Sequence, residues 1–219
     1  MRPLFIVADD HPLFRGALKE ILMSLPKGAD IVEAADFDEA ASALERNGDA
    51  DLLLLDLSMP GTSGLSGLAL LRAEYPSVPI AIVSASEDSQ IVARALELGA
   101  SGFIPKSAGF DEIRAAIATL LQGDVWLPKD MSLDAPGDPD VADLITRVKT
   151  LTPQQTRVLS MLGRGLLNKQ IAYELGVSEP TIKAHVSAIL LKLGVDSRTQ
   201  AVIQLGKLGI DPERGLVRG

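Results

Sequence analysis

The chain has 219 residues, a length that fits two small domains better than one. It contains no cysteine, which excludes disulfides and thiolate metal sites, and 47% of its residues are apolar, enough for a core in each half. The N-terminal apolar run is too short for a signal peptide and no stretch could span a membrane, so we expect a soluble cytoplasmic protein without a membrane partner.

Charge is divided unevenly along the chain. Residues 1–140 hold 10 Lys and Arg against 23 Asp and Glu, a net −13, whereas residues 141–219 hold 11 against 6, a net +5. Chance surface composition is one explanation. The other is that the first half repels polyanions and the second attracts them.

Short apolar runs alternate with amphipathic patterns over the first 122 residues. Strands are predicted at residues 4–8, 31–34, 52–55, 80–83 and 102–104. Helices are predicted at residues 13–25, 37–46, 66–74, 89–98 and 110–121. Continuous apolar strands separated by helices indicate a doubly wound, five-stranded parallel sheet covered on both faces.

The pattern changes after residue 122. Residues 123–149, rich in Pro and acidic residues, are predicted to be a linker that ends in a short helix near 141–148. Residues 150–219 are predicted to form a separate all-α domain of four helices. Thr152 is positioned to cap the first of these helices and Ser178 the third, and the glycine turn before Ser178 makes a helix-turn-helix.

Polar residues stand at the carboxyl ends of the predicted strands, where open parallel sheets bind ligands. They are Asp9, Asp10, Asp56, Ser84 and Lys106. Alone, each is more typical of a cap, a turn or solvated surface. Together the three carboxylates would repel one another, and a hard cation such as Mg²⁺ would relieve that repulsion. An aspartate could then accept a phosphoryl group whose oxygens a lysine and a hydroxyl would hold.

The segments VADDHP, LLLLDLSMPGTSG, IVSAS and GFIPKS carry a further signal. They resemble the motifs of response-regulator receiver domains over residues 3–122. The resemblance implies that Asp56 is the phosphoacceptor, that Asp9, Asp10, Asp56 and the backbone carbonyl of Ser58 bind Mg²⁺, and that Lys106 and Ser84 contact the phosphoryl group. It places Phe103 at the switch-aromatic position, although plain core packing explains a phenylalanine there nearly as well. It assigns the phosphohistidine to a partner sensor histidine kinase, so His11 is not expected to be catalytic.

The predicted third helix of the second half has two faces. At 100° per residue, Ile182, Val186, Ile189 and Leu193 form one apolar stripe. Lys183, Ala184 and Ser187 lie opposite with Pro180 and Leu191, on a face that could enter a major groove. Thr181, His185 and Lys192 lie at the flanks, where phosphates would be met. Periodicity alone fits an ordinary amphipathic helix equally well.

The run NKQIAYELGVSEPTIKAHVSAILLKL resembles the LuxR-type helix-turn-helix of NarL/FixJ regulators over residues 150–208. The resemblance implies that Lys183 and its neighbours face bases, that Asn168, Lys169 and Thr181 meet the DNA backbone, and that the last helix, 198–208, forms a homodimer.

The chain departs from this family pattern at three places. Gln154-Gln155 replaces Arg-Glu, Leu167 replaces a capping hydroxyl, and Gln170 replaces Glu. We expect Asn168 to take over the cap and amide hydrogen bonds to replace an ion pair.

These features predict a DNA-binding response regulator and not an enzyme. A phosphatase or phosphotransferase with an aspartyl-phosphate intermediate is disfavoured because Ser58 stands where the haloacid-dehalogenase pattern needs a second Asp. A vestigial receiver is disfavoured by the complete set of acids. The charge split predicts that the unphosphorylated receiver restrains the second domain, either by covering its recognition helix or, as we favour, by keeping the chain monomeric.

Overall fold

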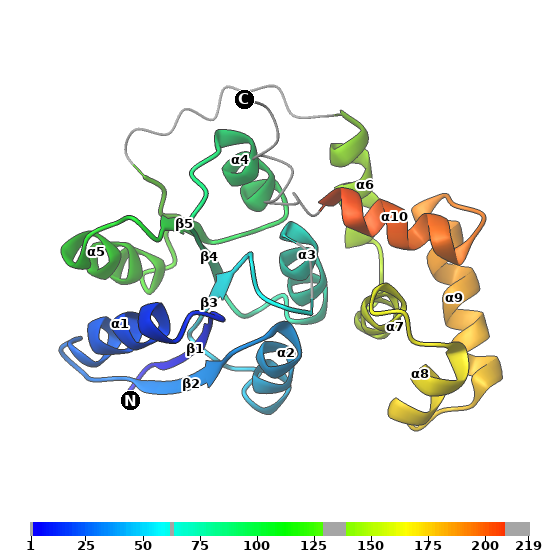
Figure 1. Ribbon diagram of the computed structural model, residues 1–219, viewed down its shortest axis with the longest axis horizontal. Coiled ribbons are helices and arrows are strands. Elements are labelled where there is room, and N and C mark those ends of the chain that lie inside the picture. The colour runs from blue at the N-terminus through cyan, green and yellow to red at the C-terminus, as the bar shows by residue number, and fades with distance from the viewer. Residues whose placement is uncertain (1, 62–63, 129–138, 209–219) are drawn as a thin grey trace.

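The computed structural model describes residues 2–61, 64–128 and 139–208. Its N-terminal half contains one parallel sheet in the order β2-β1-β3-β4-β5 (Figure 1). The strands are β1 (Leu4–Ala8), β2 (Asp30–Ala34), β3 (Leu52–Asp56), β4 (Ile80–Ser84) and β5 (Gly102–Pro105). β3 and β4 are buried along their whole length, as their unbroken apolar runs predict.

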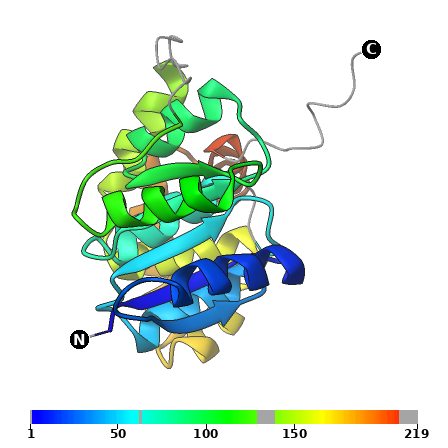
Figure 2. The ribbon, with the colours of Figure 1, turned by 90° about the vertical axis from the view of Figure 1, so that its left-hand side faces the viewer.

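Five helices cover the sheet. They are α1 (Pro12–Met23), α2 (Phe37–Arg46), α3 (Leu65–Glu74), α4 (Ser89–Glu97) and α5 (Phe110–Leu120). α1 and α5 pack on one face, seen in front in Figure 2, and α2, α3 and α4 pack on the other. This arrangement confirms the predicted doubly wound α/β fold. Within the described ranges, no helix is long and apolar enough to cross a membrane.

The segment around Trp126, which follows α5 and is called the strap below, pairs with the outer edge of the sheet. Trp126 bridges to Gly102 in parallel, and the Phe103 amide donates to the Trp126 carbonyl at 3.0 Å. Trp126 also packs against the core on the α1/α5 side of the sheet. The edge strand β5 therefore presents fewer free backbone groups to other chains.

Gly102→Ala is expected to destabilise the N-terminal half by about 1–3 kcal/mol, because an added Cβ would lie 2.8 Å from the Trp126 carbonyl oxygen and 3.0 Å from the Leu120 side chain. Urea denaturation followed by circular dichroism gives the stability, and the fluorescence of Trp126, the only tryptophan, reports the strap. Gly16→Ala is the matched control, since nothing lies within 4 Å of its added Cβ. A Gly102→Ala protein as stable as wild type would contradict the prediction.

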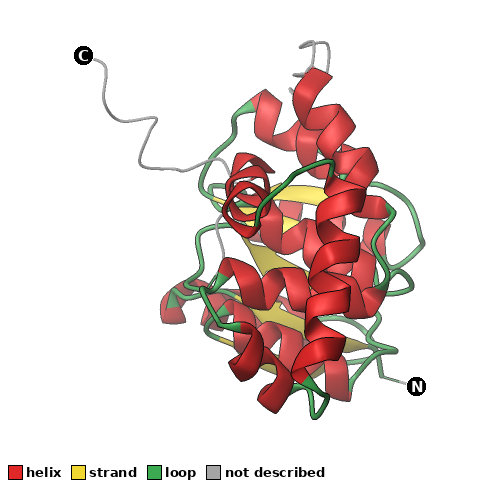
Figure 3. Ribbon diagram, turned by 90° about the vertical axis from the view of Figure 1, so that its right-hand side faces the viewer, coloured by secondary structure: helices red, strands yellow, loops and turns green. Residues whose placement is uncertain are grey.

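In the described part of the C-terminal half, every regular element is a helix. Its helices are α6 (Pro139–Lys149), α7 (Pro153–Gly163), α8 (Asn168–Glu174), α9 (Glu179–Leu193) and α10 (Arg198–Leu208). The predicted caps are confirmed: Thr152 accepts from the Gln155 amide and Ser178 from the Thr181 amide. Figure 3 views this half with the sheet behind it.

α6 lies inside the segment predicted as linker and packs on α9 and α10. Its buried residues are Val141, Leu144, Ile145 and Val148. Arg147 donates to the carbonyl of Leu193 at 3.0 Å, which satisfies an orphan carbonyl at the end of α9. The domain boundaries at 122 and 150 stay predictions, and residues 129–138 of the linker and 209–219 lie outside the described residues.

Candidate phosphorylation site and nucleic-acid interface

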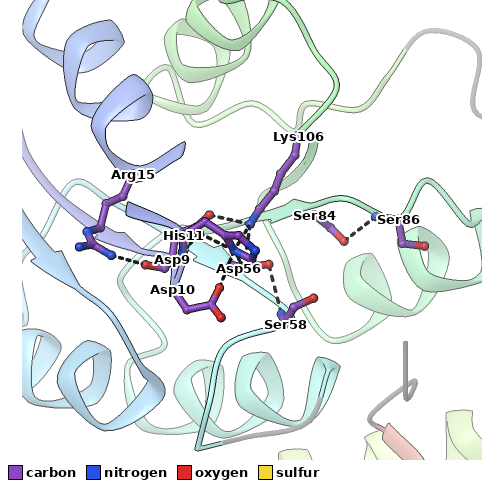
Figure 4. Close-up of polar contacts among 9 residues, drawn as sticks. All are labelled: Asp9, Asp10, His11, Arg15, Asp56, Ser58, Ser84, Ser86 and Lys106. Atoms are coloured by element: carbon purple, nitrogen blue, oxygen red, sulfur yellow. Dashed lines mark hydrogen bonds and ion pairs between the residues drawn. The ribbon is translucent and has the colours of Figure 1, made fainter. Parts of the chain in front are cut away.

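Four polar side chains come from adjacent strands of the sheet and meet at its carboxyl edge (Figure 4). Asp56 is the last residue of β3, Ser84 the last of β4, Asp9 follows β1 and Lys106 follows β5. Asp9 and Asp56 are at most 1% exposed. Parallel pairing of these neighbours brings their ends to one edge, as the sequence predicts.

Lys106 ties the two buried carboxylates together. Its Nζ lies 2.8 Å from Oδ2 of Asp56 and 2.8 Å from Oδ2 of Asp9. The other Asp56 oxygen, Oδ1, accepts from the Ser58 amide at 3.1 Å. Asp56 thus has a cation on one oxygen and a backbone donor on the other.

Burial and charge act on these groups in opposite directions. Burial raises the pKa of the Asp56 carboxyl, although hydrogen bonds from Lys106 and the Ser58 amide oppose the shift. Burial alone would lower the pKa of Lys106, but its hydrogen bonds to Asp56 and Asp9, together with the negative charges of these two carboxylates, raise that pKa. Lys106 therefore carries its positive charge at neutral pH.

The site also holds a set of oxygen donors suited to a cation. Ligand atoms of Asp9, Asp10, His11 and Asp56 all lie within 4.8 Å of one another. Three of these four groups are carboxylates, the donors that Mg²⁺ prefers, so the residues fit this ion. His11, which is not expected to be catalytic, has its Nδ1 2.6 Å from Asp10 Oδ1.

The remaining predicted receiver residues have other partners. The Ser84 hydroxyl is buried and accepts from the Ser86 amide at 3.1 Å. Phe103 is fully buried, and its amide holds the strap. Sequence reasoning missed Arg15, which donates to the carbonyl of Asp9 at 2.6 Å and pairs with Glu33. The sequence did offer a signal for Arg15, because a basic residue in the first turn of α1, just after the acid pair, lies close to the site.

The helix-turn-helix is formed by α8 and α9 around Gly176, whose positive φ of 64° makes the turn. Ile182, Ile189 and Leu193 are buried and Val186 is half-buried, as the predicted stripe requires. The opposite face of α9 is exposed at Lys183, Ala184, Ser187 and Leu191.

The residues at the flanks of α9 and at the start of α8 differ in their exposure and in their hydrogen bonds within the protein. Lys169 is exposed, whereas His185 and Asn168 are half-buried. The Thr181 hydroxyl lies 2.8 Å from that of Ser178. Lys192 donates to the Thr150 carbonyl at 2.7 Å and to Gln155 at 2.8 Å. It would have to give up both bonds to reach a phosphate.

The three departures from the family pattern have local consequences. Leu167 occupies the N-cap position of α8, so the expectation that Asn168 caps this helix is wrong. The chain turns into the helix one residue earlier because Gln170 accepts from the Leu167 amide at 2.7 Å. Gln155 closes a capping box with Thr152. Amide hydrogen bonds therefore do appear at Gln155 and Gln170.

Comparison with known proteins agrees with this geometry. Residues 5–118 match the response regulator receiver domain, and residues 149–205 match the bacterial regulatory proteins of the luxR family. The chain is 43% identical to the glycerol metabolism activator of Pseudomonas putida, over 93% of this chain and 95% of that one. It is 32% identical to the nitrate/nitrite response regulator protein NarL of Escherichia coli, over 90% of this chain and 92% of that one.

A solved structure covers most of the chain as well. RcsB from Salmonella enterica serovar Typhimurium, bound to promoter P1flhDC with the phosphomimetic BeF₃⁻, is 26% identical with a TM-score of 0.53 over 94% of this chain and 98% of that one. The chain belongs to the NarL/FixJ family of two-component response regulators, transcription regulators with a receiver domain and a LuxR-type DNA-binding domain.

Proposed function

We propose that this chain is a transcription factor whose binding to promoter DNA is controlled by phosphorylation of Asp56. The observation that carries the proposal is the environment of Asp56, buried at the end of a central strand with Lys106 and the Ser58 amide on its two oxygens. A sensor histidine kinase is the expected donor. Because the proposed partner is promoter DNA, we propose that the protein works in the cytoplasm.

The transfer itself is a displacement at phosphorus. An Asp56 oxygen forms the new O–P bond while the N–P bond of the kinase phosphohistidine breaks, and the imidazole leaves. Lys106, held 2.8 Å from Asp56, is placed to neutralise the phosphoryl oxygens, and Ser84 on the next strand is placed to donate to one of them. Burial of Asp56 keeps bulk water from the acyl phosphate.

Asp9, Asp10, Asp56 and the Ser58 carbonyl would hold Mg²⁺. When bound, the ion supplies positive charge that offsets the carboxylates and the incoming phosphoryl group.

Mg²⁺ is expected to raise the thermal unfolding midpoint, because it relieves the repulsion among Asp9, Asp10 and Asp56. At a concentration about 100 times its dissociation constant, the stabilisation is about 2.7 kcal/mol. Melts in millimolar MgCl₂ and in EDTA measure it, and Asp10→Asn should shrink the difference. An unchanged or lowered midpoint in Mg²⁺ would count against a cation site.

For the DNA-binding half, we propose that the exposed face of α9 enters the major groove. Lys183, Ala184 and Ser187 would meet base edges, and Asn168, Lys169, Thr181, His185 and Lys192 would meet phosphates. The phosphorylated chain would form a homodimer through α10 and so bind two half-sites, which raises the effective concentration at the second site.

A DNA-binding assay with and without beryllofluoride tests this function. The probe is a duplex selected from a random-sequence pool by the beryllofluoride-treated chain. Regulation by phosphorylation predicts tighter binding with beryllofluoride. Equal binding in both conditions points to a vestigial receiver, and turnover of a phosphoryl substrate without sequence-selective DNA binding points to an enzyme.

A further inference from the structure

His11 stands at the start of α1 without the role that this position usually has. It is the N-cap residue of the helix, a position where Ser, Thr, Asp and Asn are preferred because their side chains accept a backbone hydrogen bond. The side chain of His11 makes no such bond. Its ring nitrogen Nδ1 instead lies close to the carboxylates at the edge of the sheet (Figure 4).

The distances from this nitrogen to the carboxylates are those expected around a single metal ion. Nδ1 of His11 lies 2.6 Å from Oδ1 of Asp10, 3.4 Å from Oδ1 of Asp9 and 3.9 Å from Oδ2 of Asp56. Two ligands of a tetrahedral zinc ion, each about 2.1 Å from the metal, lie about 3.4 Å apart. The three distances scatter around this value, so small side-chain rotations would place all four groups around one ion.

A positive charge already lies among these groups. The Lys106 ammonium lies 2.8 Å from Oδ2 of both Asp9 and Asp56, and 3.5 Å from Nδ1 of His11. Oδ1 of Asp10 is buried from water and accepts no hydrogen bond from the described residues, although Nδ1 of His11 is in contact with it. When the ring proton is on Nε2, both atoms offer lone pairs, and an ion between them would satisfy both.

The segment that carries His11 is held in place and open to solvent. Arg15 donates to the Asp9 carbonyl at 2.6 Å and pairs with Glu33 at 3.1 Å, while the His11 amide donates to Oδ1 of Asp9 at 2.8 Å. Asp9 and Asp56 are at most 1% exposed, whereas the His11 side chain is 64% exposed. An ion that enters from water therefore meets His11 before it reaches the buried carboxylates.

An imidazole changes which ion such a site prefers. Carboxylates and carbonyls suit Mg²⁺, whereas an imidazole suits transition ions such as Zn²⁺, Co²⁺ and Ni²⁺. The two kinds of ion also differ in what they leave open. Mg²⁺ keeps several waters, which phosphoryl oxygens can replace, but a zinc ion with four protein ligands has no open position.

We propose that His11, Asp9, Asp10 and Asp56 form a zinc site that closes the phosphoacceptor. Asp56 is then a metal ligand, and the ion offers no position to an incoming phosphoryl oxygen. Zinc and Mg²⁺ exclude one another because both use the same three carboxylates. Zinc binding is independent of the proposed function, whereas its effect on the phosphorylation of Asp56 rests on that function.

Isothermal titration of the full chain with ZnCl₂ and with MgCl₂ tests the site. Wild type should bind zinc at least about tenfold more tightly than Mg²⁺. His11→Ala should lower the zinc affinity by roughly 100-fold, the upper end of what even an outer-shell partner of a metal contributes. The variant should fold, because the exposed His11 side chain makes no capping bond, and thermal melts check this. His185→Ala removes the only other histidine and should bind zinc like wild type.

Cobalt reports the ligand geometry in the wild-type chain. Co²⁺ replaces zinc in protein sites, and a four-coordinate cobalt ion absorbs visible light far more strongly than a six-coordinate one. Wild type titrated with CoCl₂ should show this strong absorption, and zinc should remove it. His11→Ala should show only the weak absorption of a six-coordinate ion, whereas His185→Ala should match wild type.

Labelling of Asp56 tests the closure. With acetyl phosphate in millimolar MgCl₂, micromolar ZnCl₂ should lower the labelled fraction of wild type roughly tenfold, because the closed site has no open position. His11→Ala, measured against its own labelling without zinc, should lose less than about twofold. EDTA equimolar to the zinc binds zinc before Mg²⁺ and should restore the labelling of wild type.

The zinc site is disproved by equal zinc affinities of wild type and His11→Ala, the result expected if His11 only forms an ion pair with Asp10. A weak, six-coordinate cobalt spectrum in wild type also disproves it. Labelling that zinc leaves intact, or lowers equally in both proteins, overturns the closure. No labelling of wild type in Mg²⁺ alone contradicts the proposed function, whereas the zinc affinities and the cobalt spectrum still decide whether the site exists.

Discussion

Asp56→Asn is expected to abolish labelling by acetyl phosphate and the response to beryllofluoride while the fold is kept. An amide oxygen is too weak a nucleophile to form the acyl phosphate. The substitution is nearly isosteric. In the wild type the backbone N–H of Ser58 donates to Asp56 Oδ1 at 3.1 Å, and the side-chain oxygen of an asparagine can accept the same bond. Burial already disfavours the charged carboxylate, so its loss costs little folding energy.

Intact-mass spectrometry after acetyl phosphate treatment measures the labelling, and thermal melts confirm folding. Asp51→Asn is the control in the same acidic run. Asp51 is exposed and accepts from the Leu4 amide at 2.8 Å, a bond that an asparagine oxygen can also make, so this variant should label like wild type. A phosphate adduct on the folded Asp56→Asn protein would show that the nucleophile is a different residue.

The fold could be predicted because its signals are local. Unbroken apolar runs such as LLLL and IAIV identify strands buried on both faces, and their alternation with helices fixes a parallel sheet. The predicted strands at 52–55 and 80–83 nevertheless end one residue earlier than β3 and β4 do. Asp56 and Ser84 are buried polar residues that finish β3 and β4, and hydropathy alone excludes such residues from a strand.

The site was predictable from strand order, but its finer contacts were not. Topology brings Asp9, Asp56 and Lys106 to one edge, so their proximity follows from sequence. The hydrogen bonds of Lys192 do not, because they join α9 to Thr150, before α7, and to Gln155, in the first turn of α7, and helical periodicity says nothing about contacts so far apart in sequence. α3 packs on α6, α7 and α10 of the second half as well as on the sheet, and its one sequence signal is the absence of a polar face in LSGLALL.

Lys183→Ala is expected to weaken binding to the selected duplex by about 1–3 kcal/mol, roughly 5- to 150-fold, and to relax the preference at one base position. Lys183 is exposed on the outer face of α9, where it pairs with the nearby Glu179 at 3.0 Å. An exposed pair of this kind contributes little to stability, so the variant should fold. Affinities for the selected duplex and its single-base variants give the profile.

Lys169→Ala provides the contrast, because Lys169 is exposed at the start of α8, where a helix meets the DNA backbone. It should weaken binding to all sequences alike and reduce the slope of log affinity against log salt by about one unit. Each lysine carries one charge, so electrostatics alone would make the two variants equivalent. The difference depends on geometry: only the outer face of α9 reaches base edges. If both variants lose affinity uniformly across the single-base series, then Lys183 contacts phosphate, and the base-reading face lies elsewhere on the domain.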